Sequence, residues 1–280
     1  MIQSEGNIRK MKVENNNPIQ YSIVLSGENI PINNYIGHSI SLKWTGDIHC
    51  VKCNRRTNKS FFQGFCYPCF IEAPESSECI LKPELCQAHE GISRDMTWAE
   101  EHCLSDHYVY LSLTSGIKVG VTRYTQIPTR WIDQGAIKAL KIAKTPNRYL
   151  AGVIEVSLKE FVSDRTSWQK MLKNNVDVNT DLYYYRNKLK SNLSEELKQY
   201  ILNNENEMCL KYPIDLYPQK IKSINLDKTK EFNGTLTGIK GQYIYIDNSY
   251  VINIRKYSGY YFKIEIEERK ESKQMQMSIL

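Results

Sequence analysis

The sequence contains no long hydrophobic run. No stretch of its 280 residues approaches the roughly 18 consecutive apolar residues that a membrane-spanning helix needs. The opening residues, MIQSEGNIRKMKVENNN, also lack the apolar stretch that follows the charges of a secretory signal peptide. We therefore expect a cytoplasmic protein without membrane contacts. The 41% hydrophobic and 24% charged residues are typical of a globular chain long enough for two or three small domains.

Cysteine is nearly absent outside one short segment. Seven of the eight cysteines lie between Cys50 and Cys103, and only Cys209 lies elsewhere. In a cytosolic chain, such crowding favours metal ligation over disulfides. The segment CVKCNRRTNKSFFQGFCYPCF holds two pairs with the C-x-x-C spacing, and a hairpin between them would bring four thiolates to one tetrahedral Zn²⁺. We expect a structural zinc site formed by Cys50, Cys53, Cys66 and Cys69.

A second group of metal-ligand residues follows with less regular spacing. Cys86 and His89, in the segment CQAH, are three positions apart and so lie on one face of a helical turn or knuckle. Together with Cys79 and Cys103 they could hold a second zinc ion. The alternative is a set of buried free thiols beside a surface histidine, because cysteine is a common core residue when it binds no metal.

Positive charge is concentrated in the middle of the chain. The formal net charge is +6, but residues 107–190 contain 14 lysines and arginines against six acidic residues, and so carry +8. An excess of this kind suits a phosphate-rich partner such as nucleic acid. A solvated lysine-rich face would give the same composition. Arg55, Arg56 and Lys59, between the first two cysteine pairs, are open to the same two interpretations.

The central region shows the pattern of one compact unit. YVYLSLT and IKVGVT alternate apolar and polar residues around a Ser-Gly turn and predict an antiparallel hairpin. A short helix can begin at Pro128 and end at Gly135. AIKALKIAK predicts a third strand, although its composition also allows a helix. A Thr-Pro pair at Thr145 then predicts the start of a second helix, whose apolar stripe continues to Trp168.

The flanking regions are interpreted mainly as β-structure. IQYSIVLSG and HSISLKWTG predict strands after a frayed polar segment at 7–17, and residues 194–210 predict a helix. Short alternating runs near the C-terminus predict a small barrel or sandwich, which could pair with the N-terminal strands. We divide the chain into a β segment at 1–48, a zinc-binding region at 49–104, the central unit at 105–175, a helical linker at 176–212, a β-rich module at 213–268 and a mobile tail at 269–280.

The order strand, strand, helix, strand, helix in the central unit resembles the GIY-YIG nuclease superfamily. Tyr108-Val109-Tyr110 matches the first-strand motif, Lys118-Val119-Gly120 the second-strand motif, Arg130 the arginine of the first helix and Glu155 the glutamate of the second. The resemblance implies an α+β chain with a small GIY-YIG-like three-stranded sheet and flanking helices, preceded by a zinc ribbon and accompanied by the small β-barrel or sandwich-like module. The whole chain also resembles an uncharacterised bacterial family, domain-of-unknown-function family 2797.

The nuclease resemblance implies metal-dependent hydrolysis of a phosphodiester in DNA or RNA. Glu155 would hold Mg²⁺ or Mn²⁺, Arg130 would stabilise charge on the phosphoryl oxygens, and Tyr110 or Tyr108 would position or deprotonate the attacking water. Lys118 stands where most members carry a second tyrosine. The alternative function is a non-catalytic zinc-ribbon adaptor that binds nucleic acid or ribonucleoprotein through a degenerate form of the same fold.

Overall fold

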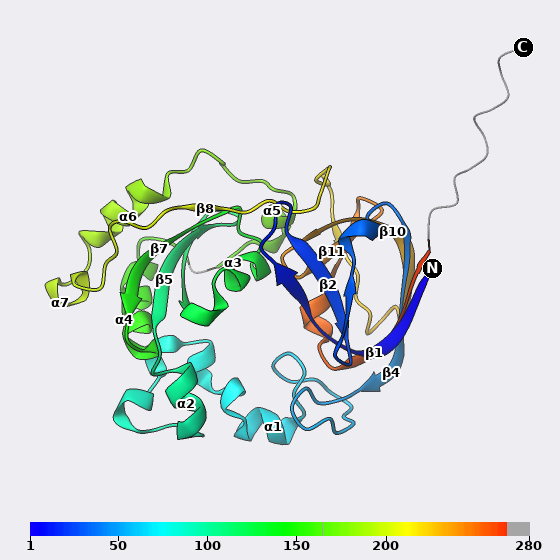
Figure 1. The fold of residues 1–280 in the computed structure, drawn as a ribbon, viewed down its shortest axis with the longest axis horizontal. Helices are drawn as coiled ribbons and strands as arrows, with labels where there is room; N and C mark the ends of the chain where they lie inside the picture. The colour runs from blue at the N-terminus through cyan, green and yellow to red at the C-terminus, as the bar shows by residue number, and fades with distance from the viewer. Residues whose placement is uncertain (164, 268–280) are drawn as a thin grey trace, which may run out of the picture.

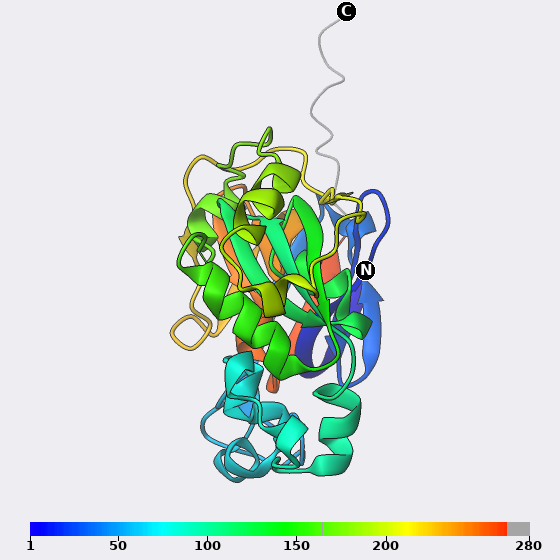
Figure 2. The ribbon, with the colours of Figure 1, turned by 90° about the vertical axis from the view of Figure 1, so that its left-hand side faces the viewer.

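The computed structural model describes residues 1–163 and 165–267, and their chain folds into a mixed α+β structure with two β-sheets (Figure 1). The larger sheet lies on the right of Figure 1 and the smaller sheet on the left. The cysteine-rich region lies below both (Figure 2). The tail predicted at 269–280 is outside the described residues. Within the described part of the chain, no helix is long and apolar enough to cross a membrane.

The larger sheet joins strands from the two ends of the chain. Its order is β3-β2-β1-β13-β4-β10-β11-β12-β9. The strands are β1 (Ile2–Glu14), β2 (Gln20–Leu25), β3 (Glu28–Pro31), β4 (Ser39–Ile48), β9 (Lys222–Ser223), β10 (Glu231–Lys240), β11 (Tyr243–Ile246), β12 (Tyr250–Asn253) and β13 (Tyr260–Glu267). In the β1–β13 ladder, Ile2 lies opposite Ile266. The N-terminal strands therefore do pair with those of the C-terminal region, a possibility that the sequence left open.

The prediction of a frayed segment at 7–17 is wrong. Most of this segment belongs to β1, whose first half pairs with β13 and whose second half pairs with β2. Ile8 and Met11 are buried in the core of the large sheet. Polar composition misled the prediction, because hydrogen bonds to two neighbouring strands hold this backbone in place.

The smaller sheet contains the predicted hairpin and third strand. Its order is β6-β5-β7-β8, with the central strand β5 antiparallel to both neighbours. The strands are β5 (His107–Leu113), β6 (Ile117–Arg123), β7 (Lys138–Thr145) and β8 (Met208–Cys209). The two-residue β8 extends the expected three strands to four. Val109, Leu111 and Val119 pack with helix α4 (Arg148–Lys159) into one core. Tyr110 contributes instead to the core of the larger sheet.

Two helices after the hairpin carry the candidate catalytic residues Arg130 and Glu155. Helix α3 (Thr129–Asp133) ends just before Gly135, whose φ of +71° suits glycine, and so agrees with the prediction. Helix α4 spans Arg148–Lys159 and is shorter than predicted at both ends. Its N-cap is Asn147, not Thr145, because the Asn147 Oδ1 accepts a hydrogen bond from the Leu150 amide. Trp168 begins a separate helix, α5 (Trp168–Leu172).

The helix predicted at 194–210 is mostly absent. After α6 (Leu182–Lys190), only the short α7 (Glu195–Lys198) forms. The chain then runs along the edge of β7, where the Leu202 amide donates to the Ile142 carbonyl and the Lys144 amide donates to the Tyr200 carbonyl. These bonds to the sheet replace the hydrogen bonds of a helix. The apolar spacing that predicted a helix instead packs Leu197 and Ile201 against the core of the small sheet.

Candidate functional site

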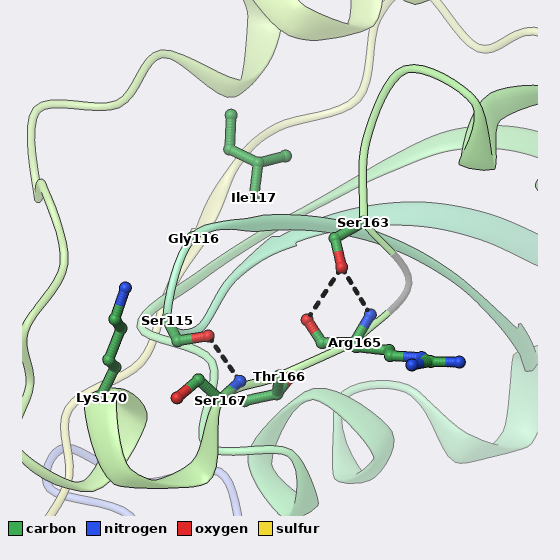
Figure 3. A pocket seen from close by; sticks show the side chains of 8 residues that line it. All are labelled: Ser115, Gly116, Ile117, Ser163, Arg165, Thr166, Ser167 and Lys170. Carbon is green, nitrogen blue, oxygen red and sulfur yellow. Dashed lines mark hydrogen bonds between the residues drawn. The ribbon is translucent and has the colours of Figure 1, made fainter.

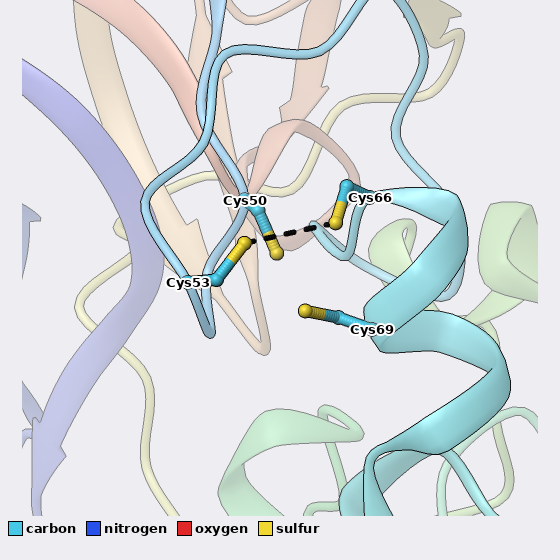
Figure 4. Close-up of side chains that lie close together, drawn as sticks. All are labelled: Cys50, Cys53, Cys66 and Cys69. Carbon is cyan, nitrogen blue, oxygen red and sulfur yellow. Dashed lines mark hydrogen bonds between the residues drawn. The ribbon is translucent and has the colours of Figure 1, made fainter.

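The first four cysteines gather into one group of metal-ligand type. Cys50 follows β4, and Cys66 and Cys69 lie at the start of helix α1 (Tyr67–Glu72). Figure 4 shows the four sulfur atoms pointing toward one another, and all lie within 4.8 Å of each other. Zn–S bonds of about 2.3 Å in a tetrahedron require sulfurs about 3.8 Å apart. The Sγ atoms of Cys53 and Cys66 are 3.7 Å apart, which fits this geometry.

Two of these four thiols, Cys50 and Cys69, have pKa values shifted in opposite directions. Burial raises the pKa of Cys50, but amide hydrogen bonds from Cys53, Cys66 and Lys52 outweigh it and lower that pKa to about 6. Burial and the neighbouring sulfurs raise the pKa of Cys69 to about 12. Four sulfurs this close cannot all become thiolates without a cation between them, because the anions repel one another. The four thiols could therefore bind zinc, as their spacing predicted.

A second group contains three of the four predicted ligands. Cys79, Cys86 and Cys103 bring their sulfurs within 4.8 Å of one another. They lie in the short turns before helix α2 (Met96–His102) and directly after that helix. Hydrogen bonds from Cys79 and Cys86 lower the pKa of Cys103 to about 2, and the same contacts raise the pKa of Cys79. A thiolate shared by two thiols is a soft donor set that could bind zinc.

The fourth predicted ligand, His89, lies outside this group of thiols. Its ring stacks on Tyr149 with 4.3 Å between the ring centroids. Another imidazole, that of His107 at the start of β5, is 1% exposed and lies in the electrostatic field of Cys103. The His107 Nδ1 is 2.7 Å from the Ser105 carbonyl oxygen, whereas its Nε2 is buried without a hydrogen-bond partner. His107 was not among the ligands predicted from sequence, although it follows Cys103 by four positions.

Tyr110 is the buried centre of the candidate catalytic set. Its side chain is fully buried, and its hydroxyl donates a 2.9 Å hydrogen bond to the Gln134 Oε1. Its ring meets Trp131 edge to face, with 5.9 Å between centroids. Gly120 lies opposite Tyr110 in the hairpin, and a Cβ at that position would be 2.6 Å from the Tyr110 hydroxyl oxygen. A glycine is therefore required for the tyrosine to lie across β6.

Arg130 and Glu155 both act on the charge of Tyr110. Burial raises the pKa of Tyr110, a contact with Arg130 opposes that rise, and the charge of Glu155 adds to it. The three groups come from β5, α3 and α4, so the fold brings distant parts of the sequence into one electrostatic neighbourhood. Glu155 is 7% exposed, and its Oε2 lies 3.4 Å from the Lys159 Nζ.

Lys118 and Tyr108 occupy flanking positions on the same sheet. Lys118 is 7% exposed and lies opposite Ser112, two positions along β5 from Tyr110. Side chains two apart on a strand share a face, and so do side chains directly opposite each other on neighbouring strands. Lys118 therefore lies on the same face of the sheet as Tyr110. Tyr108 is half-buried, and the Lys141 ammonium sits 5.1 Å from its ring centroid. Tyr108 is two positions from Tyr110 on β5 and so lies on the same face of the sheet.

Two hollows open on the surface near these elements. One, of about 440 Å³, lies between the hairpin turn and the segment leading to α5; it is lined by Ser115, Gly116, Ile117, Ser163, Arg165, Thr166, Ser167 and Lys170 (Figure 3). The other, of about 190 Å³, lies where β1, the first cysteine loop and the turn after β12 meet. The sequence predicted neither, because each is formed by segments distant in the chain.

Comparison with known proteins places the chain by family alone. No curated protein and no solved structure matches it. The model of the family described as "Protein of unknown function (DUF2797)" matches residues 37–262. The matched region includes both cysteine groups, the small sheet with α3 and α4, and most of the large sheet. Because the match covers well over half of the sequence, the chain belongs to this family of proteins of unknown function.

Proposed function

We propose that this chain acts on nucleic acid and hydrolyses a phosphodiester bond in it with a divalent cation. The observation that carries the proposal is that Arg130 on α3 and Glu155 on α4 both lie close enough to Tyr110 on β5 to shift its pKa. The GIY-YIG resemblance anticipates this combination, with the tyrosine on a central strand and the arginine and glutamate on the two helices that follow. The positive charge of residues 107–190 supports a polyanionic substrate.

Each residue has a role that follows from its chemistry. Mg²⁺ or Mn²⁺, when bound, would polarise the scissile phosphate, and both cations prefer oxygen ligands such as the Glu155 carboxylate. Lys159, now 3.4 Å from that carboxylate, would have to withdraw to admit the cation. Arg130 can hold two phosphoryl oxygens through its planar guanidinium. Lys118 would add positive charge on the same face of the sheet.

One observation favours a second candidate, an adaptor that binds nucleic acid without cleaving it. Tyr110 is fully buried, and its hydroxyl donates a hydrogen bond to the Gln134 Oε1. Burial also raises the pKa of this phenol. A phenol in this state stays protonated at neutral pH and does not reach a water molecule on the surface. Cleavage would require this part of the sheet to open around the substrate, whereas binding through surface cations would not.

A cleavage assay separates the two candidates. Branched, single-stranded and duplex DNA and RNA are incubated with the protein and Mg²⁺ or Mn²⁺, and the products are resolved on denaturing gels. For the nuclease, we expect metal-dependent cleavage that Glu155→Gln reduces by at least about 100-fold, because the variant loses the charge that holds the cation. Glu160→Gln, on the exposed residue just after α4, is the matched control and should cleave normally. Binding without cleavage on every substrate contradicts the nuclease and supports the adaptor.

We also propose that both cysteine groups hold structural zinc. Four thiolates close the coordination sphere in the first group, and three thiolates with one imidazole would do so in the second. The two sites lie in the segment that connects β4 of the larger sheet to β5 of the smaller sheet, and zinc would fix the loops of that segment. In this proposal zinc supports the fold and takes no part in the hydrolysis, because a closed sphere leaves no position for water.

A further inference from the structure

The smaller hollow is lined by positive charge from both sides. Its lining residues are Arg9, Lys10, Val51, Gln63, Arg255 and Ser258. Arg9 and Lys10 are consecutive on β1, and consecutive side chains of a regular strand point to opposite faces. The pairing of β1 with β2 shifts register between Arg9 and Lys12, which explains how both neighbours reach one hollow. Arg255 comes from the turn at Ile254–Tyr257 between β12 and β13.

Within the described residues, neither arginine forms an ion pair, whereas the lysine forms one. The Lys10 Nζ lies 2.8 Å from Asp133 Oδ2, so its charge is balanced. Within the described residues, the Arg9 guanidinium makes no hydrogen bond or ion pair. The Arg255 Nε donates a 2.6 Å hydrogen bond to the Gln63 Oε1, and no described residue accepts a hydrogen bond from its two terminal nitrogens. Gln63 thus holds one edge of the guanidinium while the other edge is left for a ligand.

Both arginine side chains are partly buried in the fold. Burial lowers the pKa of Arg9 against the opposing effect of Cys50, and burial also lowers the pKa of Arg255, where Asp133 opposes the shift and Arg130 adds to it. Both side chains nevertheless stay charged at neutral pH, because the guanidinium is too strong a base to lose its proton. An oxyanion in the hollow could accept paired N–H···O bonds from these guanidinium groups.

We propose that this hollow binds one phosphate group of a nucleic-acid backbone through Arg9 and Arg255. Its volume of about 190 Å³ is below the roughly 300–1,000 Å³ of pockets that enclose drug-sized ligands, so it suits a single phosphate and not a whole nucleotide. Arg255 also lies close enough to Arg130 on α3 for that charge to lower its pKa. The inference rests on the proposed action on nucleic acid, but it concerns binding and does not require cleavage.

The experiment measures binding in the absence of divalent cations. A fluorescent single-stranded oligonucleotide is titrated in EDTA with wild-type protein and with the Arg9→Gln, Arg255→Gln and doubly substituted variants, at several salt concentrations. We expect each single change to weaken binding roughly tenfold, as the loss of a charged hydrogen bond does. The slope of log K against log salt should fall in magnitude by about 0.7 for the one lost phosphate contact. Lys222→Gln, which removes the same charge from an exposed position on β9, is the matched control and should bind as wild type.

Two further arms identify the source of the phosphate and test for misfolding. A sugar–phosphate strand without bases should compete with the oligonucleotide at the arginines, whereas inorganic phosphate should compete only weakly. If Arg9→Gln and Arg255→Gln leave oligonucleotide affinity and salt slope unchanged, the inference is overturned, even if they weaken binding of inorganic phosphate. The Arg9 side chain makes no hydrogen bond within the described residues, so Arg9→Gln should keep the wild-type thermal unfolding midpoint. This variant remains informative if Arg255→Gln misfolds. Arginine-dependent binding without cleavage would retain this inference while rejecting hydrolysis.

Discussion

At the scale of single residues, the histidines near the second cysteine group differ in what their ring nitrogens contact. The His107 Nδ1 is fixed by a backbone carbonyl, and its Nε2 is buried without a partner. A metal-binding histidine has this arrangement, because one nitrogen is oriented by a second group while the other meets the metal. His89 lies against the ring of Tyr149. Neither imidazole belongs to the group in which the sulfurs of Cys79, Cys86 and Cys103 lie within 4.8 Å of one another, and we propose His107 as the fourth ligand because its buried Nε2 has no partner among the described residues.

We expect the His107→Ala variant to lose zinc from the second group and His89→Ala to keep it. Wild-type protein, dialysed against a moderate chelator, should contain two zinc ions per chain by elemental analysis. The His107 variant should then retain about one, because three thiolates alone leave the zinc coordination sphere incomplete. The first cysteine group is the internal control, since its zinc should remain in both variants. Zinc loss in the His89 variant alone would restore the ligand set predicted from sequence.

The sequence predicted the cysteine groups well because thiol ligands near each other in the chain form local knuckles. The spacing of Cys50 and Cys53 already implies that their sulfurs can meet at one ion. His107 could not be recognised in the same way, since the isolation of its Nε2 depends on residues packed around it from other elements. The role of Gly120 was also hidden. Only the hairpin register reveals that Tyr110 crosses directly over it.

At the scale of secondary structure, helix α4 is the element that presents Glu155. It begins where Asn147 accepts a hydrogen bond from the Leu150 amide at 2.9 Å. The Arg148 amide also donates to the Cys103 carbonyl, so the start of the helix is attached to the second cysteine group. A shift in the position of Cys103 would therefore alter the position of the N-terminus of α4.

Replacing the cap of α4 should destabilise the protein by about 1 kcal/mol. The Asn147→Ala variant leaves the Leu150 amide without its side-chain acceptor, and the loss of such a cap typically costs about 0.5–2 kcal/mol. The free energy of unfolding is measured by urea titration followed by circular dichroism. Asn58→Ala, at an exposed loop position, is the matched control and should change stability little. Equal stabilities of the two variants would show that the cap contributes nothing measurable.

The type of most central elements could be predicted, but their ends could not. Alternation predicted β5 and β6, because a two-residue period shows directly in the sequence, whereas β7 was predicted from an apolar run whose composition also allowed a helix. The end of α4 was overestimated because apolar residues continue at helical spacing as far as Trp168, although that residue packs in another helix. Residues 199–207 follow the edge of β7, and that choice depends on a free sheet edge which lies elsewhere in the chain.

At the scale of the whole molecule, polar contacts link the two sheets. Asp133 on α3 accepts hydrogen bonds from Lys10 on β1 and from Gln242 beside β11. Lys240, at the end of β10, is fully buried and donates a 2.8 Å hydrogen bond to Asn174 after α5. Composition gave no sign of a buried lysine in the large sheet. The sequence predicted two β-rich regions, and their junction depends on these long-range contacts.

We expect the pH dependence of stability above pH 7 to come partly from Lys240. Burial lowers its pKa to about 7 in the folded protein, whereas the usual value is 10.5. Between these values the unfolded chain binds more protons than the folded chain, so stability should rise with pH across that window; below about pH 7 both states are protonated and the cost of burial is fully present. Lys240→Met should raise the urea midpoint at pH 7 and reduce the rise between pH 7 and 9.5.

Lys222→Met provides the control for this measurement. Lys222 lies exposed on β9 of the same sheet, so its replacement removes a charge without changing a buried group. This control should keep the wild-type rise in stability between pH 7 and 9.5. An equal slope in the Lys240 variant and the wild type would show that Lys240 titrates normally.

The pairing of β1 with β13 has a consequence for how the protein is made. Ile2 cannot meet Ile266 until the ribosome has released nearly the whole chain. At synthesis rates of about 5–20 residues per second, β1 waits on the order of ten seconds or more for its partner. During that time residues 2–7, the half of β1 that pairs with β13, have no partner strand. The large sheet is therefore completed only after β13 has left the ribosome, whereas the small sheet, whose three main strands are close in sequence, can form earlier.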